Sequence, residues 1–207
     1  TAITINSTVT TTAAGPVVIT NSGLLTIAAA GDMTLDGAFT QNGAGAVSTA
    51  GDISTTNDAV SFLRAVTLTG NVAITTQTGG AGAGDITFSS TLDGAFTLGL
   101  TAGTGTITFT GAVGTTRLGA ITLTSAGTVL ASSSITAASI SQVAGSVLTT
   151  FNGALNTNAV AGISLVSTAI TINSTVTTTA AGPVVITNSG LLTIAAAGDM
   201  TLDGAFT

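Results

Sequence analysis

Aspartate is the residue type in this chain with the clearest potential for chemistry. The sequence contains eight Asp but no Glu, Lys, His, Cys or Tyr, and its only basic side chains are Arg64 and Arg117. General acid–base and nucleophilic catalysis need a second group that tunes or orients the first. Because no cluster of carboxylates and basic residues is visible in the sequence, we expect a protein that is not an enzyme and uses no cofactor.

The aspartates recur in two contexts that are typical of turns. Four of them follow glycine, and three stand in Leu-Asp-Gly within the heptapeptide TLDGAFT, which occurs three times. Asp before Gly tolerates unusual backbone angles and can hydrogen-bond its own turn. We therefore predict turns at Asp36 and Gly37 and at Asp93 and Gly94.

Calcium binding is a second interpretation of the aspartates. The segment GGAGAGDIT resembles the calcium-binding RTX nonapeptide G-G-x-G-x-D-x-U-x in Gly79, Gly80 and Gly82. Gly84 takes the aspartate position, however, and Asp85 follows one residue late. A calcium site needs several converging oxygens, which one imperfect copy does not supply. Asp85 is thus a weak calcium candidate, and loose screening of the net charge of −6 is the simpler interpretation.

Ice and nucleic acid are two further ligands to consider. Thr-x-Thr pairs, such as Thr67 with Thr69 and Thr122 with Thr124, resemble the flat faces of ice-binding solenoids. Segments such as ISLV at Ile163 lack the pair, so ice binding is a minor alternative. Two Arg in 207 residues cannot neutralise a phosphate backbone, which argues against nucleic acid as a partner.

Short bursts of alternating apolar and hydroxyl residues run along the whole chain, such as ITFS, TITFT and ITLT. This period of two predicts strands with one buried face, and the β-branched residues suit a pleated sheet. No segment has the i, i+3, i+4, i+7 apolar stripe of a helix, so we expect an all-β protein with the intervening Thr outward. The predicted core-facing residues are Ile86, Phe88, Ile107, Phe109, Ile121 and Leu123.

The first forty residues recur without a change at the end of the chain. The segment from Thr1 to Thr40 is identical with the segment from Thr168 to Thr207. We interpret residues 1–167 as one complete unit of a tandem array and residues 168–207 as the start of the next. The junction GISLVST contains no Pro or charged spacer, so we expect one continuous structure without a linker.

Glycine divides the long repeat into shorter intervals. Ten glycines from Gly31 to Gly198 form nine intervals of similar length. Short strands joined by tight corners at such intervals suit the coils of a parallel β-solenoid. The predicted fold is a right-handed parallel β-helix, a β-solenoid of about eight or nine coils in each tandem repeat. A β-sandwich or barrel is the alternative, but such a closed domain would need a linker between copies.

The chain is poor in charge, with 5% charged residues against roughly 25% in an ordinary domain. In a solenoid each outward position recurs in the next coil about 5 Å away, where like charges destabilise each other and Thr, Ser and Asn form ladders. The composition therefore agrees with a solenoid. Its apolar runs stop far short of the roughly 20 residues of a membrane-spanning helix, so no transmembrane segment is expected.

The stretch GDITFSSTLDGAFTLGLTAGTGTITFTGAVGTTRLGAITLTSAG, from Gly84 to Gly127, resembles giant secreted bacterial proteins of the β-strand-repeat or filamentous-haemagglutinin-like type. The similarity rests on the ITF and ITLT strands and on the Gly, Thr and Ala bias, and no binding residue can be carried over. It implies a right-handed β-helix that is extracellular or at the cell surface. We expect a structural fibre, and the alternative is the shaft of an adhesin that binds a host or cell surface.

Copies of the chain itself are the expected partners. Each coil of a solenoid exposes strand edges above and below it, so an isolated unit has an open edge at both ends. We expect end-to-end pairing at these edges. The uncharged sides offer a second surface for lateral packing.

Overall fold

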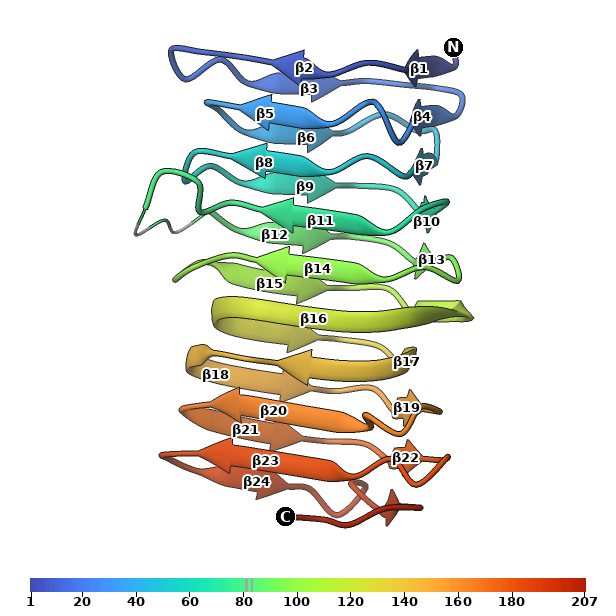
Figure 1. Cartoon of the computed structure of the whole chain (residues 1–207), viewed down its shortest axis with the longest axis vertical. Helices are drawn as coiled ribbons and strands as arrows, with labels where there is room; N and C mark the ends of the chain where they lie inside the picture. Colours follow the sequence, from blue (N-terminus) through green and yellow to red (C-terminus); the bar gives the residue numbers. More distant parts are fainter. Residues whose placement is uncertain (81, 83) are drawn as a thin grey trace.

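The chain folds into one stack of β-coils (Figure 1). The computed structural model describes residues 1–80, 82 and 84–207. Within them 25 strands are joined and every pairing is parallel, which confirms the predicted all-β parallel solenoid. In the part of the chain that the structure describes, no helix is long and apolar enough to cross a bilayer.

Three columns of strands run along the stack, and each turn of the chain visits columns 1, 2 and 3 in that order. Column 1 contains β1 (Ile3–Ile5), β4 (Leu25–Ile27), β7 (Val47–Thr49), β10 (Val66–Leu68), β13 (Leu92–Asp93), the first part of β16 (Val113–Ala131), the first part of β17 (Ile135–Gln142), β19 (Leu155–Thr157), β22 (Val176–Thr178) and β25 (Met200–Thr201). Column 2 contains β2 (Val9–Thr10), β5 (Met33–Leu35), β8 (Ile53–Thr55), β11 (Val72–Thr75), β14 (Leu98–Thr101), the middle of β16, the end of β17, β20 (Ile163–Ser167) and β23 (Val184–Asn188). Column 3 contains β3 (Val17–Ile19), β6 (Phe39–Gln41), β9 (Val60–Phe62), β12 (Ile86–Phe88), β15 (Thr106–Phe109), the end of β16, β18 (Gly145–Phe151), β21 (Ala169–Ile172) and β24 (Leu192–Ile194).

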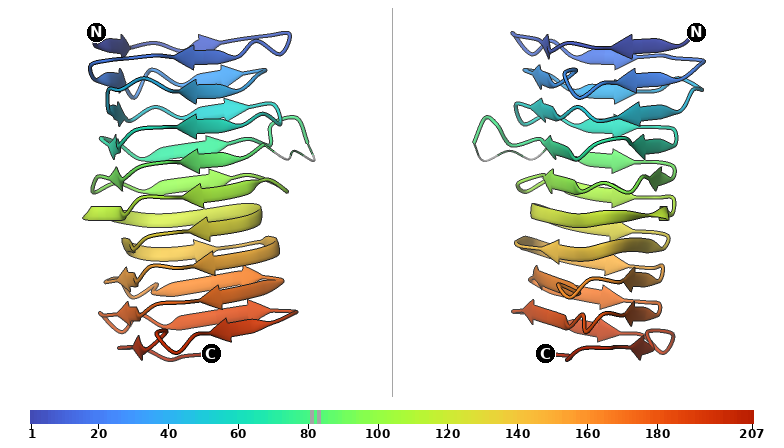
Figure 2. Two further views of the ribbon diagram at one scale, coloured as in Figure 1. Left: turned by 180° about the vertical axis from the view of Figure 1, so that it is seen from behind. Right: turned by 45° about the vertical axis from the view of Figure 1, so that its right-hand side comes forward.

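The successive partners in column 1 count the turns of the chain. From β1 to β25 the chain makes nine turns. The turns differ in length: the shortest in this column runs from Val47 to Val66, and the longest follows directly from Val66 to Leu92. The ends of the chain lie at opposite ends of the stack (Figure 2).

The coil length predicted from the glycine intervals is too short, because the glycines mark different corners. Gly70 lies between columns 1 and 2, and Gly84 lies between columns 2 and 3 of the same turn. One turn can therefore contain two of the counted glycines. From Ile3 to its copy Ile170 the chain makes seven complete turns and two-thirds of another, which is close to the lower value of the predicted eight or nine.

The core is a narrow apolar interior that side chains from the three columns fill. Alternation along each strand places Val, Ile, Leu and Phe inward, and the Thr residues between them lie on the outer face. The six residues predicted to face the core have exposed fractions of 0–2%: Ile86, Phe88, Ile107, Phe109, Ile121 and Leu123.

Four phenylalanines form a ladder inside column 3. The ring centroids of Phe39 and Phe62 are 5.3 Å apart, those of Phe62 and Phe88 are 5.4 Å apart, and those of Phe88 and Phe109 are 5.6 Å apart. The last two pairs are stacked, with interplanar angles of 7° and 5°. Consecutive coils lie about 4.8 Å apart, so one inward Phe per coil brings the rings into contact.

Candidate functional site

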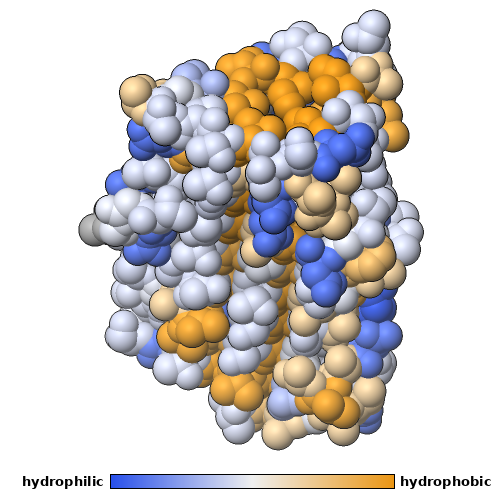
Figure 3. Space-filling model, turned by 45° about the horizontal axis from the view of Figure 1, so that its top comes forward, coloured by the Kyte–Doolittle hydropathy of each residue, from blue (hydrophilic) through white to orange (hydrophobic). Residues whose placement is uncertain are grey.

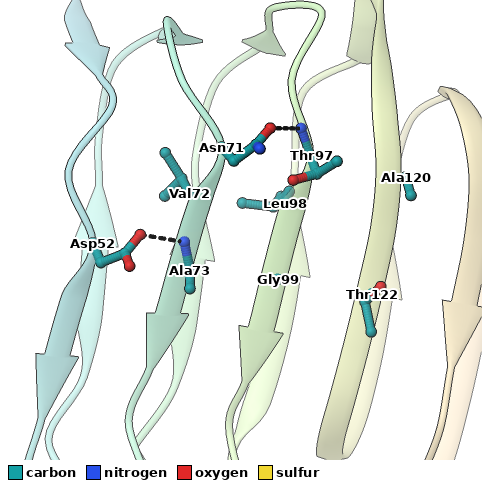
Figure 4. A pocket seen from close by; sticks show the side chains of 9 residues that line it. All are labelled: Asp52, Asn71, Val72, Ala73, Thr97, Leu98, Gly99, Ala120 and Thr122. Atoms are coloured by element: carbon teal, nitrogen blue, oxygen red, sulfur yellow. Dashed lines mark hydrogen bonds between the residues drawn. The ribbon is translucent and has the colours of Figure 1, made fainter. Parts of the chain in front are cut away.

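The aspartate carboxylates accept hydrogen bonds from the backbone of neighbouring coils. Asp32 Oδ1 accepts from the Asp52 N–H at 2.8 Å, and Asp52 Oδ1 accepts from the Ala73 N–H at 2.7 Å. Asn71 Oδ1 accepts from the Thr97 N–H at 3.1 Å in the same way. The last two bonds lie side by side on adjacent coils (Figure 4). These side chains tie one coil to the next near the start of the column 2 strands.

Asp85, the weak calcium candidate, has the same kind of contact. Its Oδ1 accepts from the Thr106 N–H at 2.7 Å, at the start of the next strand in column 3. Among the described residues, no group of three or more His, Cys, Asp or Glu is placed to hold a metal ion. Ala81 and Ala83 of the RTX-like segment lie outside the described residues. The observed partner of the Asp85 carboxylate is thus backbone.

The predicted turn aspartates also bind a neighbouring coil and not their own turn. Asp36 Oδ2 accepts from the Ala14 N–H at 2.7 Å, and Asp93 Oδ1 accepts from the Thr116 N–H at 2.8 Å. Gly94 follows with a φ of 115°, a conformation that favours glycine, and a Cβ there would lie 2.2 Å from the Leu68 carbonyl oxygen. Asp-Gly therefore serves close coil stacking as well as the turn.

A shallow groove of about 420 Å³ crosses the outer face of column 2 beside these bonds (Figure 4). Asp52, Asn71, Thr97 and Thr122 lie along it on four successive coils, and Gly99 lies on the same coil as Thr97. Among the described residues that line it, Asp52 is the only ionisable one, and one of its oxygens already binds backbone. Acid–base catalysis needs a second such group, and the described residues of this lining contain no second ionisable side chain.

Buried polar groups inside the coils were not predicted from the sequence. Gln41 Nε2 donates to Asn21 Oδ1 at 2.7 Å and to the Gly45 carbonyl oxygen at 3.1 Å. Gln41 follows Phe39 at a spacing of two, so the alternation that places Phe39 inward could have identified it. The hydrogen bond between Gln41 and Asn21 links consecutive coils. A search for alternating apolar residues alone does not find these two polar side chains.

The two arginines also link coils. Arg117 Nη1 donates to the Ala137 carbonyl oxygen at 2.8 Å, and its Nη2 donates to Asn156 Oδ1 at 2.6 Å. Arg64 Nε donates to the Gly43 carbonyl oxygen at 3.2 Å. Both guanidinium groups thus contact the body of the stack.

The identical segments allow a covered end and an open end to be compared within one chain. Ile3 pairs with Leu25 as Ile170 pairs with Leu192, and the pairings of β2 with β5 and of β22 with β25 correspond likewise. Ile170, in β21, is covered by the paired strand β18 and is 0% exposed, whereas Ile3 lies in the first strand and is only partly buried. Phe39 is 0% exposed and its copy Phe206 is 47% exposed.

The two copies do not lie on the same column. Ile3 is in column 1 and Ile170 is in column 3, while Val9 is in column 2 and Val176 is in column 1. Every residue of the second copy is therefore displaced by one column, or one third of a turn. The two copies have the same strand pairing, although equivalent residues lie in different columns.

Comparison with protein-family models, curated proteins and solved structures finds no match for this chain. At least six of the eight aspartate carboxylates accept a hydrogen bond from a backbone N–H of another coil. The repeated residues whose burial differs between the two copies, such as Phe39 and Phe206, lie towards the two ends of the stack.

Proposed function

We propose that this chain is part of a structural, non-catalytic fibre that lies outside the cell or at its surface. The single observation that carries the proposal is the passage of the strand columns through the repeat junction. β21 to β23 of the second copy stack on β18 to β20 of the first in unbroken register.

A stack of this kind grows by adding copies, because each coil contacts only its neighbours. Every additional repeat would cover the open end of the preceding copy and present the same strand pairing again. Length is the property that such an array gains from repetition. That property suits a fibre better than a binding pocket or a catalytic centre.

The side-chain chemistry supports the same role. At least six of the eight aspartates bind backbone N–H groups of other coils: Asp32, Asp36, Asp52, Asp85, Asp93 and Asp203. Acidic side chains that are used in coil stacking contribute to cohesion along the fibre axis. The fibre needs neither a metal ion nor a cofactor in this account.

Immunogold labelling of the cells that produce the protein tests this function. Antibodies against the solenoid should label thin fibres outside intact cells, and deletion of the gene should remove those fibres. Labelling that appears only after the cells are opened would contradict the location. An adhesin shaft would instead show loss of binding to a host or cell surface when a non-repeated tip is deleted while the fibres remain.

A further inference from the structure

We propose that Asn152 is a site of spontaneous covalent modification, at which the backbone nitrogen of Gly153 attacks the side-chain amide and converts the asparagine into aspartyl and isoaspartyl products. Asn152 follows β18 and lies at the corner between columns 3 and 1. The inference goes beyond the proposed fibre and does not depend on it, because it concerns the chemistry of one corner inside the stack.

The reaction needs only the chain and water. A bond forms between the Gly153 nitrogen and the Asn152 Cγ atom, and the bond from Cγ to Nδ2 breaks. The displaced nitrogen leaves as ammonia and takes up the proton of the Gly153 N–H. Solvent water then opens the resulting cyclic imide. Cleavage at Cγ gives an aspartyl residue, whereas cleavage at the main-chain carbonyl carbon of position 152 gives an isoaspartyl residue.

Two asparagines of the sequence precede a glycine, Asn42 and Asn152. Glycine has no side chain to hinder an attack by its nitrogen. Both asparagines are exposed, and the Asn152 Oδ1 atom accepts a hydrogen bond from Asn173 Nδ2 at 2.8 Å. Asn42 Oδ1 accepts from Thr20 Oγ1 at 2.6 Å. This oxygen gains negative charge during the attack, and a donor at such a distance stabilises that charge, so the two positions share this feature.

The two glycines differ in what holds them. The Gly43 carbonyl oxygen accepts from Gln41 Nε2 at 3.3 Å and from Arg64 Nε at 3.2 Å, and Gly43 is buried. Among the hydrogen bonds of the described residues, none involves the N–H or the carbonyl oxygen of Gly153. The peptide group must rotate to bring the glycine nitrogen towards Cγ. Of the two glycines, Gly153 is the one that can do so without loss of a hydrogen bond.

Coil stacking explains why a glycine follows Asn152. A Cβ on Gly153 would lie 2.1 Å from the Ser133 carbonyl carbon and 2.3 Å from the Ser134 nitrogen. No side chain fits at such distances. The close approach of two coils at this corner thus requires the residue that also makes the preceding asparagine reactive.

The modification would introduce a negative charge into a part of the chain that has none. From Gly94 to Gly198 the sequence contains no Asp or Glu, and Arg117 is its one charged side chain. Pale residues of intermediate hydropathy cover much of the side of the stack that Figure 3 shows. An aspartyl carboxylate at position 152 can still accept from Asn173 Nδ2. The isoaspartyl product should loosen the corner, because it adds a methylene group to a main chain that is packed against Ser133.

The test incubates the whole folded chain at mildly alkaline pH and follows deamidation by mass spectrometry. Trypsin cleaves after Arg64 and Arg117, so Asn42 and Asn152 fall on different fragments, 1–64 and 118–207. Fragmentation by electron transfer locates the gain in mass and distinguishes aspartyl from isoaspartyl products. Asn152 should react at least about fivefold faster than Asn42, because Gly43 must first lose its hydrogen bonds.

Two controls separate the effect of the fold from that of the Asn-Gly sequence. In urea both asparagines should react at similar rates, since the hydrogen bonds of Gly43 are then lost. An Asn173→Ala variant removes the donor to Asn152 Oδ1, so it should slow the reaction of Asn152 by at least about threefold and leave Asn42 unchanged. Hydrogen exchange that shows protection of β14 to β23 establishes that this variant is folded.

Equal rates at the two asparagines of the folded chain, or a slower reaction at Asn152, would overturn the proposal. An aspartyl product without its isoaspartyl isomer would also overturn it, because direct hydrolysis of the amide by water gives the aspartyl product alone. Faster reaction in the folded Asn173→Ala variant would mean that Asn173 restrains the Asn152 side chain, and would overturn its assigned role as a donor to the reacting oxygen.

Discussion

Aspartate in this protein is best understood as a backbone acceptor between coils. The Asp52 carboxylate accepts from the Ala73 N–H near a corner, directly before the residues at which β8 and β11 begin to pair. An unpaired N–H near such a corner lowers stability, although water compensates in part. The same acceptor role is available to an amide oxygen, as Asn71 demonstrates in the next coil.

Two substitutions of Asp52 should therefore distinguish the contribution of its hydrogen bond to stability from the contribution of its charge. Asp52→Ala is expected to lower the free energy of unfolding by about 1 kcal/mol, because the Ala73 N–H loses its partner. Asp52→Asn should lie close to the unchanged protein, since an amide oxygen can accept the same bond. Urea denaturation followed by circular dichroism measures both. Equal losses in the two variants would mean that the charge is what matters at this position.

The heptapeptide TLDGAFT shows where residue-level prediction stops. Phe39 in its first copy is 0% exposed and begins β6, whereas Phe96 in its second copy is 39% exposed and precedes β14. Gly94 has a φ of 115° and the equivalent Gly37 does not adopt a positive φ. The same heptapeptide thus lies at two different corners of the coil and has two different backbone conformations. Its conformation therefore depends on the neighbouring coil and not on its sequence alone. A turn could be predicted from Asp-Gly, but its direction could not.

At the scale of the strand, the phenylalanine ladder contains four of the five phenylalanines that are buried in the described part of the chain. Phe88 is stacked between Phe62 and Phe109 and is 2% exposed. Truncation of a buried Phe costs roughly 3–5 kcal/mol when the cavity cannot collapse. We expect Phe88→Ala to reach this range, whereas Phe96→Ala, with its 39% exposed ring, should change stability by less than about 1 kcal/mol. Similar losses in both variants by urea denaturation would contradict the ladder's role.

Two glycines of neighbouring elements provide a second matched comparison. Gly94→Ala would introduce a Cβ 2.2 Å from the Leu68 carbonyl oxygen at a φ of 115°, so it should lower the unfolding free energy by more than about 1 kcal/mol. Gly99→Ala places a Cβ whose nearest neighbour is the Ala73 Cβ at 4.0 Å. This second change should be neutral or stabilising by up to about 1 kcal/mol. Thermal melts of both variants decide between corner strain and a general intolerance of side chains.

The strands were predictable because their signal is local, while the coil boundaries depend on distant contacts. Alternation in ITFS and ITLT places Ile86, Phe88, Ile121 and Leu123 inward without knowledge of the partner strands. The number of turns depends on corner length, and the shortest turn, which ends at Val66, is followed directly by the longest. Glycine counting cannot register that variation. The carboxylate-to-backbone bonds likewise join residues about one turn apart, so no local pattern identified their partners.

At the scale of the whole molecule, the repeat and the coil do not coincide. One repeat spans seven and two-thirds turns, so each copy begins one column away from its predecessor. In a fibre, a given outward residue would therefore lie on a different one of the three sides in each of three successive copies. A fibre with this symmetry presents equal surfaces to neighbours in three directions. An integral number of turns would place every copy on one side.

An array of three copies should return to its starting column for the first time. It would make about 23 turns, which at about 4.8 Å per coil is roughly 110 Å along the axis, and one copy would rise roughly 37 Å with a rotation of one third of a turn. Cryo-electron microscopy of such arrays, with a gold label on one outward cysteine introduced at Thr26 of each copy, measures the rise and the rotation together. Labels that follow one another straight along one side would show that the repeat contains a whole number of turns. Labels that move to the next of the three sides with each copy would show that one repeat contains seven and two-thirds turns. The lengths of the corners within the repeat would then set the rotation between successive copies.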